Sequence, residues 1–299
     1  MLRIGLLGSD NSHAERFSEM LNLPEHPAYL LGADAQIVAI WGEEPERTQQ
    51  VAASGRIPMI VARPEDMLGQ IDAVICVTRH GGLHLPLTQP YLEARVPTFV
   101  DKPLAVTPDD ARALVALAQR TGTPFTSFST VRFSADAQGF IEGARALGGV
   151  RAGVYTGPAT RRNIYGGLVF YAIHAVELML ATQGTGILWV DAVEGTAADK
   201  EGNGNVTAVC AWADGSTAVV ELTVDAHYGF RALALGREGA LSADLDISDC
   251  YREGMRRILA VLKGGPSPVP LPEMVEAIQV CHAMELSLQL GTRVDVANV

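Results

Sequence analysis

Short apolar runs alternate with helix-like segments through the first 125 residues, and this alternation constrains the fold more than any other feature. The apolar runs lie at 2–7, 35–42, 57–62, 72–78 and 98–100, and another follows near residue 125. Short, almost continuous apolar runs are typical of strands that a parallel sheet buries on both faces. Strands that alternate with helices predict a doubly wound parallel sheet. We therefore expect residues 1–125 to form one α/β domain.

The pattern changes in the second half of the chain. From residue 187 onward, strands of alternating polarity are separated by turns at Asp214-Gly215 and at 236–239. Turns of this kind join antiparallel neighbours. Helical spacing is expected from the residues after Gly166-Gly167 to residue 180, and over 272–290. Residues 126–299 are therefore expected to form an α+β domain with an open, mostly antiparallel sheet.

One face of this second sheet is expected to be exposed and apolar. We assign Val206, Val220 and Leu222 to that face. Exposed apolar sheet faces usually bind a partner. The sequence thus predicts a homodimer or homotetramer formed through the C-terminal sheet.

Composition excludes several classes of function. The formal net charge is −11 and no run of Lys and Arg stands out, so nucleic-acid binding is not expected. No apolar segment approaches 18 residues, and the first residues do not resemble a secretory signal. The four cysteines are scattered without close pairs. We expect a cytoplasmic protein with reduced thiols, no membrane span and no metal site.

The turn after the first apolar run is a candidate phosphate-binding loop. The run ends at Gly8, and a helix is expected to begin at about Ser12, with Ser12 and Glu15 as a capping box. A strand, a tight turn and a helix N-terminus form the geometry that holds a dinucleotide pyrophosphate. Ser9 and Asn11 could add hydrogen bonds.

The glycine fingerprint in this turn is altered. With Gly8 as the first glycine, Asp10 and His13 occupy the places of the second and third. Asp10 brings negative charge to the expected pyrophosphate position, and His13 is bulky where close packing is usual. A cofactor loop and a purely structural turn both remain open.

The end of the second apolar run bears on the choice of cofactor. Dinucleotide enzymes place an acid there for the ribose hydroxyls, but Gly42 occupies the position and Glu43 and Glu44 follow. Glu43 either binds the ribose or, with Glu44, favours the start of the next helix. Acids at this point would repel a 2′-phosphate, so NAD is favoured slightly over NADP. Arg47 would weaken that preference.

A lysine follows the fifth apolar run, in Asp101-Lys102-Pro103. Pro103 favours extended backbone at Lys102, which places the lysine at the carboxyl end of a strand. Ligands of open α/β sheets bind at that edge, although the tripeptide alone is more typical of a surface turn. The strand before it ends at Val77-Thr78, and a polar loop containing Arg79, His80 and His84 follows.

The predicted helix after Gly166-Gly167 carries His174 and Glu177, three residues apart and near one face. A single histidine on an apolar helix is more often a hydrogen-bonded core residue than a catalyst. The residues of the helix leave both interpretations open.

Several segments together resemble one family. IGLLG near the start, VICVT with the loop to His84, VDKPLAVT, and SFSTVRF with Arg132 are similar to the glucose–fructose oxidoreductase/inositol dehydrogenase/rhizopine-catabolism (Gfo/Idh/MocA) family. The resemblance implies a Rossmann domain over 1–125 that binds NAD or NADP. It implies a substrate-binding and oligomerisation domain over 126–299.

The resemblance also implies roles for individual residues. Lys102 corresponds to the lysine beside the nicotinamide, within Asp-Lys-Pro instead of Glu-Lys-Pro. The cofactor side is expected to include Val77, Thr78, Arg79, His80, His84 and Asp101, together with the glycine-loop residues and Gly42-Glu43. Arg132 is expected at the substrate.

The family places a catalytic histidine in the pattern Asp-x-Gly-x-His-x-x-Asp. His174 matches that histidine, and Glu177 approximates the last acid. Phe170 replaces the first Asp, and Ala172 replaces the Gly. Tyr165 and Tyr171 are the polar neighbours that could substitute for the missing Asp at the substrate.

We therefore expect an oxidoreductase that transfers a hydride between a nicotinamide and a small hydroxylated, sugar- or polyol-like substrate. Lys102 and His174 would be its catalytic residues. The departures at Asp10, His13, Gly42 and Phe170 leave two alternatives. One is a non-catalytic ligand sensor with the same two-domain fold, and the other is an enzyme with altered chemistry.

Overall fold

The computed structural model describes residues 1–299, which form two compact units. Unit 1 consists of Met1–Ala105, Asp109–Phe128 and Tyr251–Leu271, and unit 2 consists of Val106–Pro108, Ser129–Cys250 and Pro272–Val299. The sequence predicts a single boundary, between residues 125 and 126. The chain instead returns to unit 1 after residue 250, in a segment whose assignment depends on contacts with distant residues.

Unit 1 is built on a six-stranded parallel sheet in the order β3-β2-β1-β4-β5-β6. This is the strand order of the Rossmann fold, and it confirms the predicted fold class. The strands are β1 (Leu2–Leu7), β2 (Ala35–Trp41), β3 (Met59–Ile60), β4 (Ala73–Cys76), β5 (Thr98–Val100) and β6 (Phe125–Ser127).

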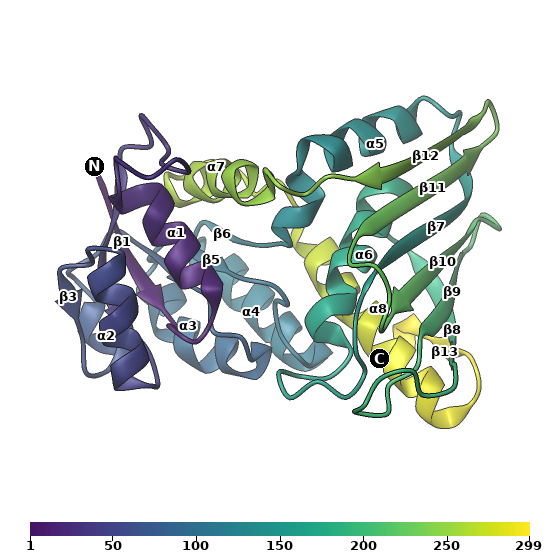
Figure 1. Ribbon diagram of the computed structural model, residues 1–299, viewed down its shortest axis with the longest axis horizontal. Helices are drawn as coiled ribbons and strands as arrows, with labels where there is room; N and C mark the ends of the chain where they lie inside the picture. The colour runs from purple at the N-terminus through teal and green to yellow at the C-terminus, as the bar shows by residue number, and fades with distance from the viewer. The chain divides into compact units, whose positions relative to one another are not determined.

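Helices follow the strands of unit 1. They are α1 (Ser12–Asn22), α2 (Pro45–Ser54), α3 (His84–Glu93), α4 (Pro108–Thr121) and, from the returning segment, α7 (Cys250–Leu262), with short 3-10 turns at Pro64–Met67 and Gly81–Leu83. Figure 1 shows α7 beside α1. Arg252 of α7 donates a hydrogen bond to Pro27 O at 3.0 Å, in the loop after α1.

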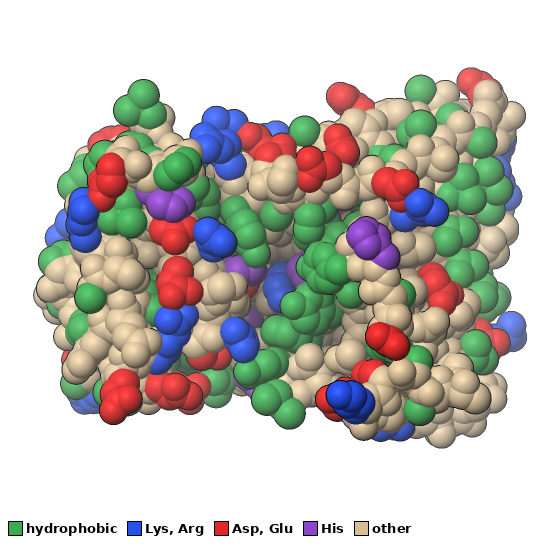
Figure 2. All heavy atoms as spheres, in the orientation of Figure 1, with side chains coloured by type: hydrophobic (Ala, Val, Ile, Leu, Met, Phe, Trp, Pro, Cys, Tyr) green, Lys and Arg blue, Asp and Glu red, His purple; other side chains and the backbone are tan.

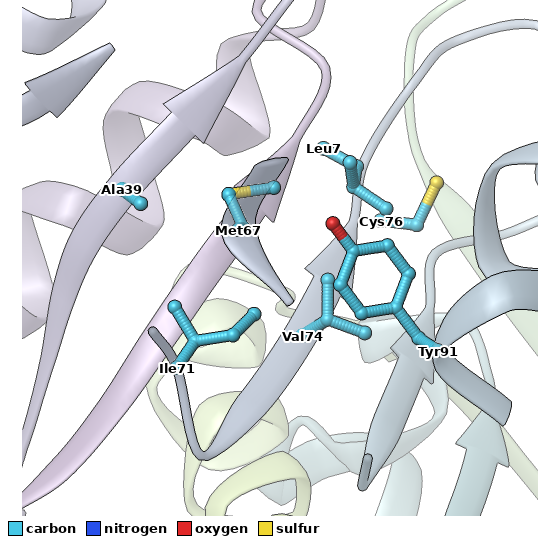
Figure 3. Packing of buried hydrophobic residues seen from close by; sticks show 7 residues of the cluster. All are labelled: Leu7, Ala39, Met67, Ile71, Val74, Cys76 and Tyr91. Carbon is cyan, nitrogen blue, oxygen red and sulfur yellow. The ribbon is translucent and has the colours of Figure 1, made fainter. Parts of the chain in front are cut away.

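The core of unit 1 lies between the central strands and the segments that cover them (Figure 3). Leu7, Val74 and Cys76 of β1 and β4 are fully buried there, together with Tyr91 of α3. The Tyr91 hydroxyl donates a hydrogen bond to Pro64 O. A buried Tyr needs such a partner, so this contact also fixes the turn at 64–67.

Unit 2 contains a seven-stranded sheet in the order β12-β11-β7-β10-β9-β8-β13. Only β7 and β10 pair in parallel, and every other neighbouring pair is antiparallel. The sheet is therefore mixed and mostly antiparallel, as predicted. Its strands are β7 (Val150–Pro158), β8 (Ile187–Glu194), β9 (Val206–Trp212), β10 (Thr217–Thr223), β11 (Phe230–Gly236), β12 (Ala240–Leu245) and β13 (Val294–Asp295).

The helices of unit 2 are α5 (Ala135–Arg145), α6 (Val169–Gln183) and α8 (Leu271–Leu290), with short 3-10 turns at Thr130–Phe133 and Val296–Asn298. Figure 1 shows α6 lying across β7 and β10. The helix predicted after Gly166-Gly167 is confirmed, because α6 begins at Val169. Gly166 and Gly167 have φ values of 114° and 74°, a left-handed backbone that keeps them outside the helix.

The assignment of the exposed sheet face was wrong. Val206, Val220 and Leu222 are at most 1% exposed and lie on the face that the helices cover. The opposite face carries half-buried Val209 and Val219, which are register partners across β9 and β10. Alternation defines two faces but does not tell which of them the helices cover.

Candidate active site in two parts

Gly8 makes the tight turn between β1 and α1. Its φ is 104°, and a Cβ at this position would lie 2.7 Å from the backbone nitrogen of Thr78. Only glycine fits such a backbone and such a contact. The first position of the fingerprint is therefore used as in a dinucleotide fold, because the ends of β1 and β4 approach closely here.

His13 fills the space of the third glycine and connects three elements. Its Nδ1 lies 2.6 Å from Asp101 Oδ2 after β5, and its Nε2 lies 3.1 Å from the Tyr251 hydroxyl of α7. Asn11, not Ser12, is the N-cap of α1, with its Oδ1 accepting from His13 N–H at 3.2 Å. The residues that replace the glycines of this turn therefore belong to a network of buried hydrogen bonds.

Asp101 is fully buried and remains ionised. Burial would raise the pKa of its carboxyl group, but the charge and hydrogen bond of His13 and the charge of Lys102 hold the pKa below its usual value. Its Oδ1 is buried and accepts no hydrogen bond. Asp10 presents a similar oxygen, because its Oδ2 accepts from Arg79 N–H at 3.1 Å while its Oδ1 is buried without a donor.

The end of β2 is closely packed and offers no buried acid. A Cβ at Gly42 would lie 2.2 Å from Ser9 Oγ, and Ser9 and Thr48 share a hydrogen bond of 2.9 Å. Glu43 is exposed. A larger residue at position 42 would break the contact between the glycine loop and α2.

Arg47 is engaged by an acid on α1. Its NH1 lies 2.8 Å from Glu15 Oε1, and this hydrogen bond raises the pKa of the guanidinium. The negative charges of Asp10 and Glu44 also act on it. The cation is therefore surrounded by negative charge.

Lys102 lies at the carboxyl edge of the parallel sheet, directly after Asp101, and is 6% exposed. Val77 and Thr78 are buried at the end of β4, and His80 caps the next turn by accepting from Gly82 N–H at 3.1 Å. The structure thus brings the predicted cofactor residues of β1, β4 and β5 to one edge, as parallel strands require.

His84 holds two of the loops at this edge. Its Nε2 lies 2.9 Å from Thr78 O and its Nδ1 lies 3.1 Å from Leu104 O. The ring is fully buried, and burial lowers its pKa. Both nitrogens face backbone carbonyls, so the ring connects the loop after β4 to the segment after β5.

In unit 2, His174 of α6 is oriented by Ser129. The His174 Nδ1 lies 2.6 Å from Ser129 Oγ, and Ser129 N–H donates to Glu177 Oε2 at 2.8 Å. The Ser129 hydroxyl oxygen also accepts from Val131 N–H at 3.2 Å. When the Ser129 hydroxyl donates its proton to Nδ1, the imidazole proton is on Nε2.

Glu177 belongs to a buried group of two acids and one arginine. Arg132 NH1 lies 2.8 Å from Glu273 Oε1 and 3.6 Å from Glu177 Oε2. Burial raises the pKa of Glu177 to about 7, although Arg132 opposes this rise. Arg132, expected at the substrate, is therefore engaged by two carboxylates and is only 6% exposed.

The sequence did not predict Ser129 and Glu273 as site residues. Ser129 lies in the SFSTVRF segment, three residues before Arg132. Glu273 stands at the start of a long helix, and no local pattern there indicates a buried partner for Arg132.

Two aromatic rings contact His174. The ring centroids of Tyr171 and Phe230 lie 5.6 and 5.7 Å from that of His174. The row continues from Tyr171 to Phe170 at 5.0 Å and from Phe170 to Tyr165 at 5.1 Å. Phe170, at the place of the family's first Asp, is thus one ring in an aromatic surface.

Possible metal sites, membrane spans, cysteines and surface charge give no further indication of function. No group of three or more His, Cys, Asp or Glu side chains is placed to hold a metal ion, and no helix is both long and apolar enough to cross a membrane. All four cysteines are free and buried. On the face shown in Figure 2, basic side chains are interspersed with acidic ones.

Comparisons with known proteins agree with this fold. The family model GFO_IDH_MocA, described as an oxidoreductase family with an NAD-binding Rossmann fold, matches residues 2–128. A search of curated proteins gave no match.

Among solved structures, a probable dehydrogenase from Thermotoga maritima has a TM-score of 0.86 and 18% identity, with all of both chains covered. A scyllo-inositol dehydrogenase from Lactobacillus casei, solved with NAD(H) and scyllo-inositol, has a TM-score of 0.84 and 14% identity over 99% of each chain. A myo-inositol dehydrogenase from Corynebacterium glutamicum has a TM-score of 0.82 and 17% identity, covering 99% of this chain and 98% of its own. Residues 2–128 thus match the model of an NAD-binding oxidoreductase family, and the whole chain shares the fold of these solved structures.

Proposed function

We propose that the protein is a cytoplasmic, NAD-dependent oxidoreductase acting on a small hydroxylated substrate. The bound cofactor would supply the acceptor for a hydride from the substrate carbon, and a base of the protein would take the hydroxyl proton. The observation that carries this proposal is the buried Asp101-Lys102 pair at the carboxyl edge of the parallel sheet, beside the Gly8 turn. Four buried, free cysteines support a reducing compartment.

The residues of unit 1 fit a dinucleotide. The Gly8 turn and the N-terminus of α1 have the geometry that suits a pyrophosphate. The buried Oδ1 atoms of Asp10 and Asp101 need donors, and ribose hydroxyls are donors. The turn at 8–13 with Thr78 and Arg79 would hold the cofactor, which supplies the hydride acceptor when bound.

We propose NAD rather than NADP as the cofactor. A 2′-phosphate needs an available cation near the end of β2, but Arg47 already pairs with Glu15 at 2.8 Å. Glu43 and Glu44 are exposed at the same place and would repel the phosphate. These charges support a preference for the unphosphorylated ribose.

Two side chains are assigned to the proton chemistry. Lys102 would exchange a proton with the reacting oxygen, because it lies at the carboxyl edge of the parallel sheet, where the ligands of such sheets bind. His174 would act as the acid–base partner or as a substrate ligand. Ser129 supports this role by fixing the ring at Nδ1.

A ligand sensor is the second candidate. It is favoured by Phe170, which stands on α6, the helix of His174, where the resembling family has a carboxylate, and which is only 7% exposed. A sensor would retain nucleotide or ligand binding without turnover. The two functions therefore differ in a steady-state assay.

A cofactor titration followed by an activity screen tests the proposal. NAD at about 100 times its dissociation constant should stabilise the protein by about 2.7 kcal/mol, measured by thermal unfolding, and NADP should give a smaller shift. Lys102→Ala should lower turnover by at least about a hundredfold, the usual range for a proton-transfer group, while the NAD shift remains. Absence of a shift with either nucleotide at millimolar concentration contradicts the enzyme, and binding without turnover of any alcohol supports the sensor.

A further inference from the structure

A cavity of about 280 Å³ opens in unit 2 where β7 and β10 end. Pro158 and Thr223, the last residues of these strands, are register partners in the one parallel pair of the sheet. Both line the cavity. Tyr171 of α6 forms another wall, and its ring is in contact with His174. The cavity therefore adjoins the histidine assigned to catalysis.

The walls of this cavity are largely apolar and aromatic. Tyr171 and Tyr228 contribute rings, and Ala159, Val224 and Ala226 contribute aliphatic surface. Tyr228 is 59% exposed, which is unusual for so large an aromatic side chain. Thr160 and Thr223 add hydroxyl groups to the lining.

The charged groups of the cavity all have one sign. Asp199 and Asp225 are its charged lining residues, and no Lys, Arg or His lines it. Both carboxylate oxygens of Asp199 accept from Asn203, at 2.7 and 2.8 Å, so this carboxylate is fixed in place. Asp225 is exposed and has a φ of 47°.

We propose that this cavity binds the protonated amino group of an amino alcohol whose hydroxyl group is the one oxidised. The carboxylates would attract the ammonium, and the tyrosine faces would contact it by cation–π interaction. The aliphatic walls would cover the carbon skeleton. The inference rests on the proposed function, because it names the substrate class of the same site.

Three ring compounds of similar shape test this choice by calorimetry near pH 7. They are trans-2-aminocyclohexanol, trans-cyclohexane-1,2-diol and trans-2-hydroxycyclohexanecarboxylate, which are cationic, neutral and anionic. We expect the amine to bind at least tenfold more tightly than the diol, and the carboxylate to bind most weakly. Added salt should weaken only the binding of the amine. Equal or tighter binding of the diol overturns the inference.

Two variants locate the binding. Asp225→Asn should lower the preference for the amine severalfold, and it preserves the fold because Asn tolerates the positive φ. The matched control is Asp191→Asn, an exposed carboxylate of β8 outside the cavity, which should change nothing. Tyr228→Ala should weaken both the amine and the diol. Equal effects of Asp225→Asn and Asp191→Asn overturn the assignment to this cavity.

The increase in thermal stability on adding NAD is measured on the same samples. It distinguishes a failure of the substrate class from a failure of the proposed oxidoreductase function. A retained NAD shift without preference for the amine overturns the substrate class alone. Preference for the amine without any nucleotide shift overturns the oxidoreductase and leaves an amine-binding protein.

Discussion

At residue scale, His13 shows how a departure from a fingerprint can be part of a network. The glycine that it replaces normally permits close helix packing. Here the imidazole occupies that space and contacts Asp101 and Tyr251 at 2.6 and 3.1 Å. The carboxylate beside Lys102 is therefore paired with a group from the glycine loop.

Removal of this imidazole is expected to be costly. His13→Ala leaves the fully buried Asp101 without its partner on α1, and loss of one member of a buried charged pair typically costs about 3 kcal/mol. Urea unfolding measures the loss. His26→Ala, at a half-buried histidine 3.8 Å from Glu19, is the control and should cost well under 1 kcal/mol. Similar losses in the two variants would show that the His13–Asp101 pair contributes little.

Glu177 should make stability fall as pH rises. Burial raises the pKa of its carboxyl group from 4.5 to about 7 in the folded protein. Between these values the native state holds a proton that the unfolded state releases. The free energy of unfolding then decreases by up to about 1.4 kcal/mol per pH unit through this window, and the difference is constant outside it.

Glu177→Gln isolates this effect, because the amide oxygen can still accept from Ser129 N–H. The free energy of unfolding of the natural protein minus that of the variant should fall by about 2 kcal/mol between pH 5 and pH 7. Urea titrations at several pH values measure this difference. The exposed Glu43→Gln provides the comparison and should give a flat line, and a flat line for Glu177→Gln would refute the raised pKa.

At element scale, most of the fold could be predicted from the sequence. Apolar runs and helical spacing are local features of the sequence. They indicated the six strands of unit 1 and that these strands run parallel. The face of the second sheet could not be predicted, because the position of α6 decides which face is covered. The partners of the site residues are also distant in the chain: His13 and Tyr251 are 238 residues apart.

The turn from β1 to α1 offers a test at this scale. In Gly8→Ala the new Cβ would meet Thr78 N at 2.7 Å, and φ is 104°, so strain and a steric clash combine. We expect a loss of about 3 kcal/mol in urea unfolding. Gly122→Ala is the matched control, because its φ is 66° and nothing lies within 4 Å of the new Cβ.

The control variant should lose only about 1 kcal/mol, the cost of a left-handed alanine. A loss in Gly8→Ala no larger than in Gly122→Ala would show that the β1 and β4 ends can separate without penalty. The close approach that supports the dinucleotide geometry would then be unnecessary for folding.

At the scale of the whole molecule, the open face of the second sheet is the proposed contact between copies. Val154, Val209, Val219 and Leu233 lie in one row across β7, β9, β10 and β11, as the strand registers place them side by side. All four are half-buried within a single chain. A continuous apolar row of this kind is more stable when a second copy covers it.

A charge placed in this row should separate the copies. Val219→Lys would bury an ammonium in the contact, which costs several kcal/mol when it has no partner, and should convert a dimer or tetramer into a monomer in sedimentation equilibrium. Because the side chain lies on the open face, the monomer should stay folded. Leu31→Lys, at a residue of unit 1 that is 93% exposed, adds the same charge elsewhere and should leave the assembly unchanged. A natural protein that is already monomeric at tens of micromolar, or a Val219→Lys variant that still associates, would rule out this face.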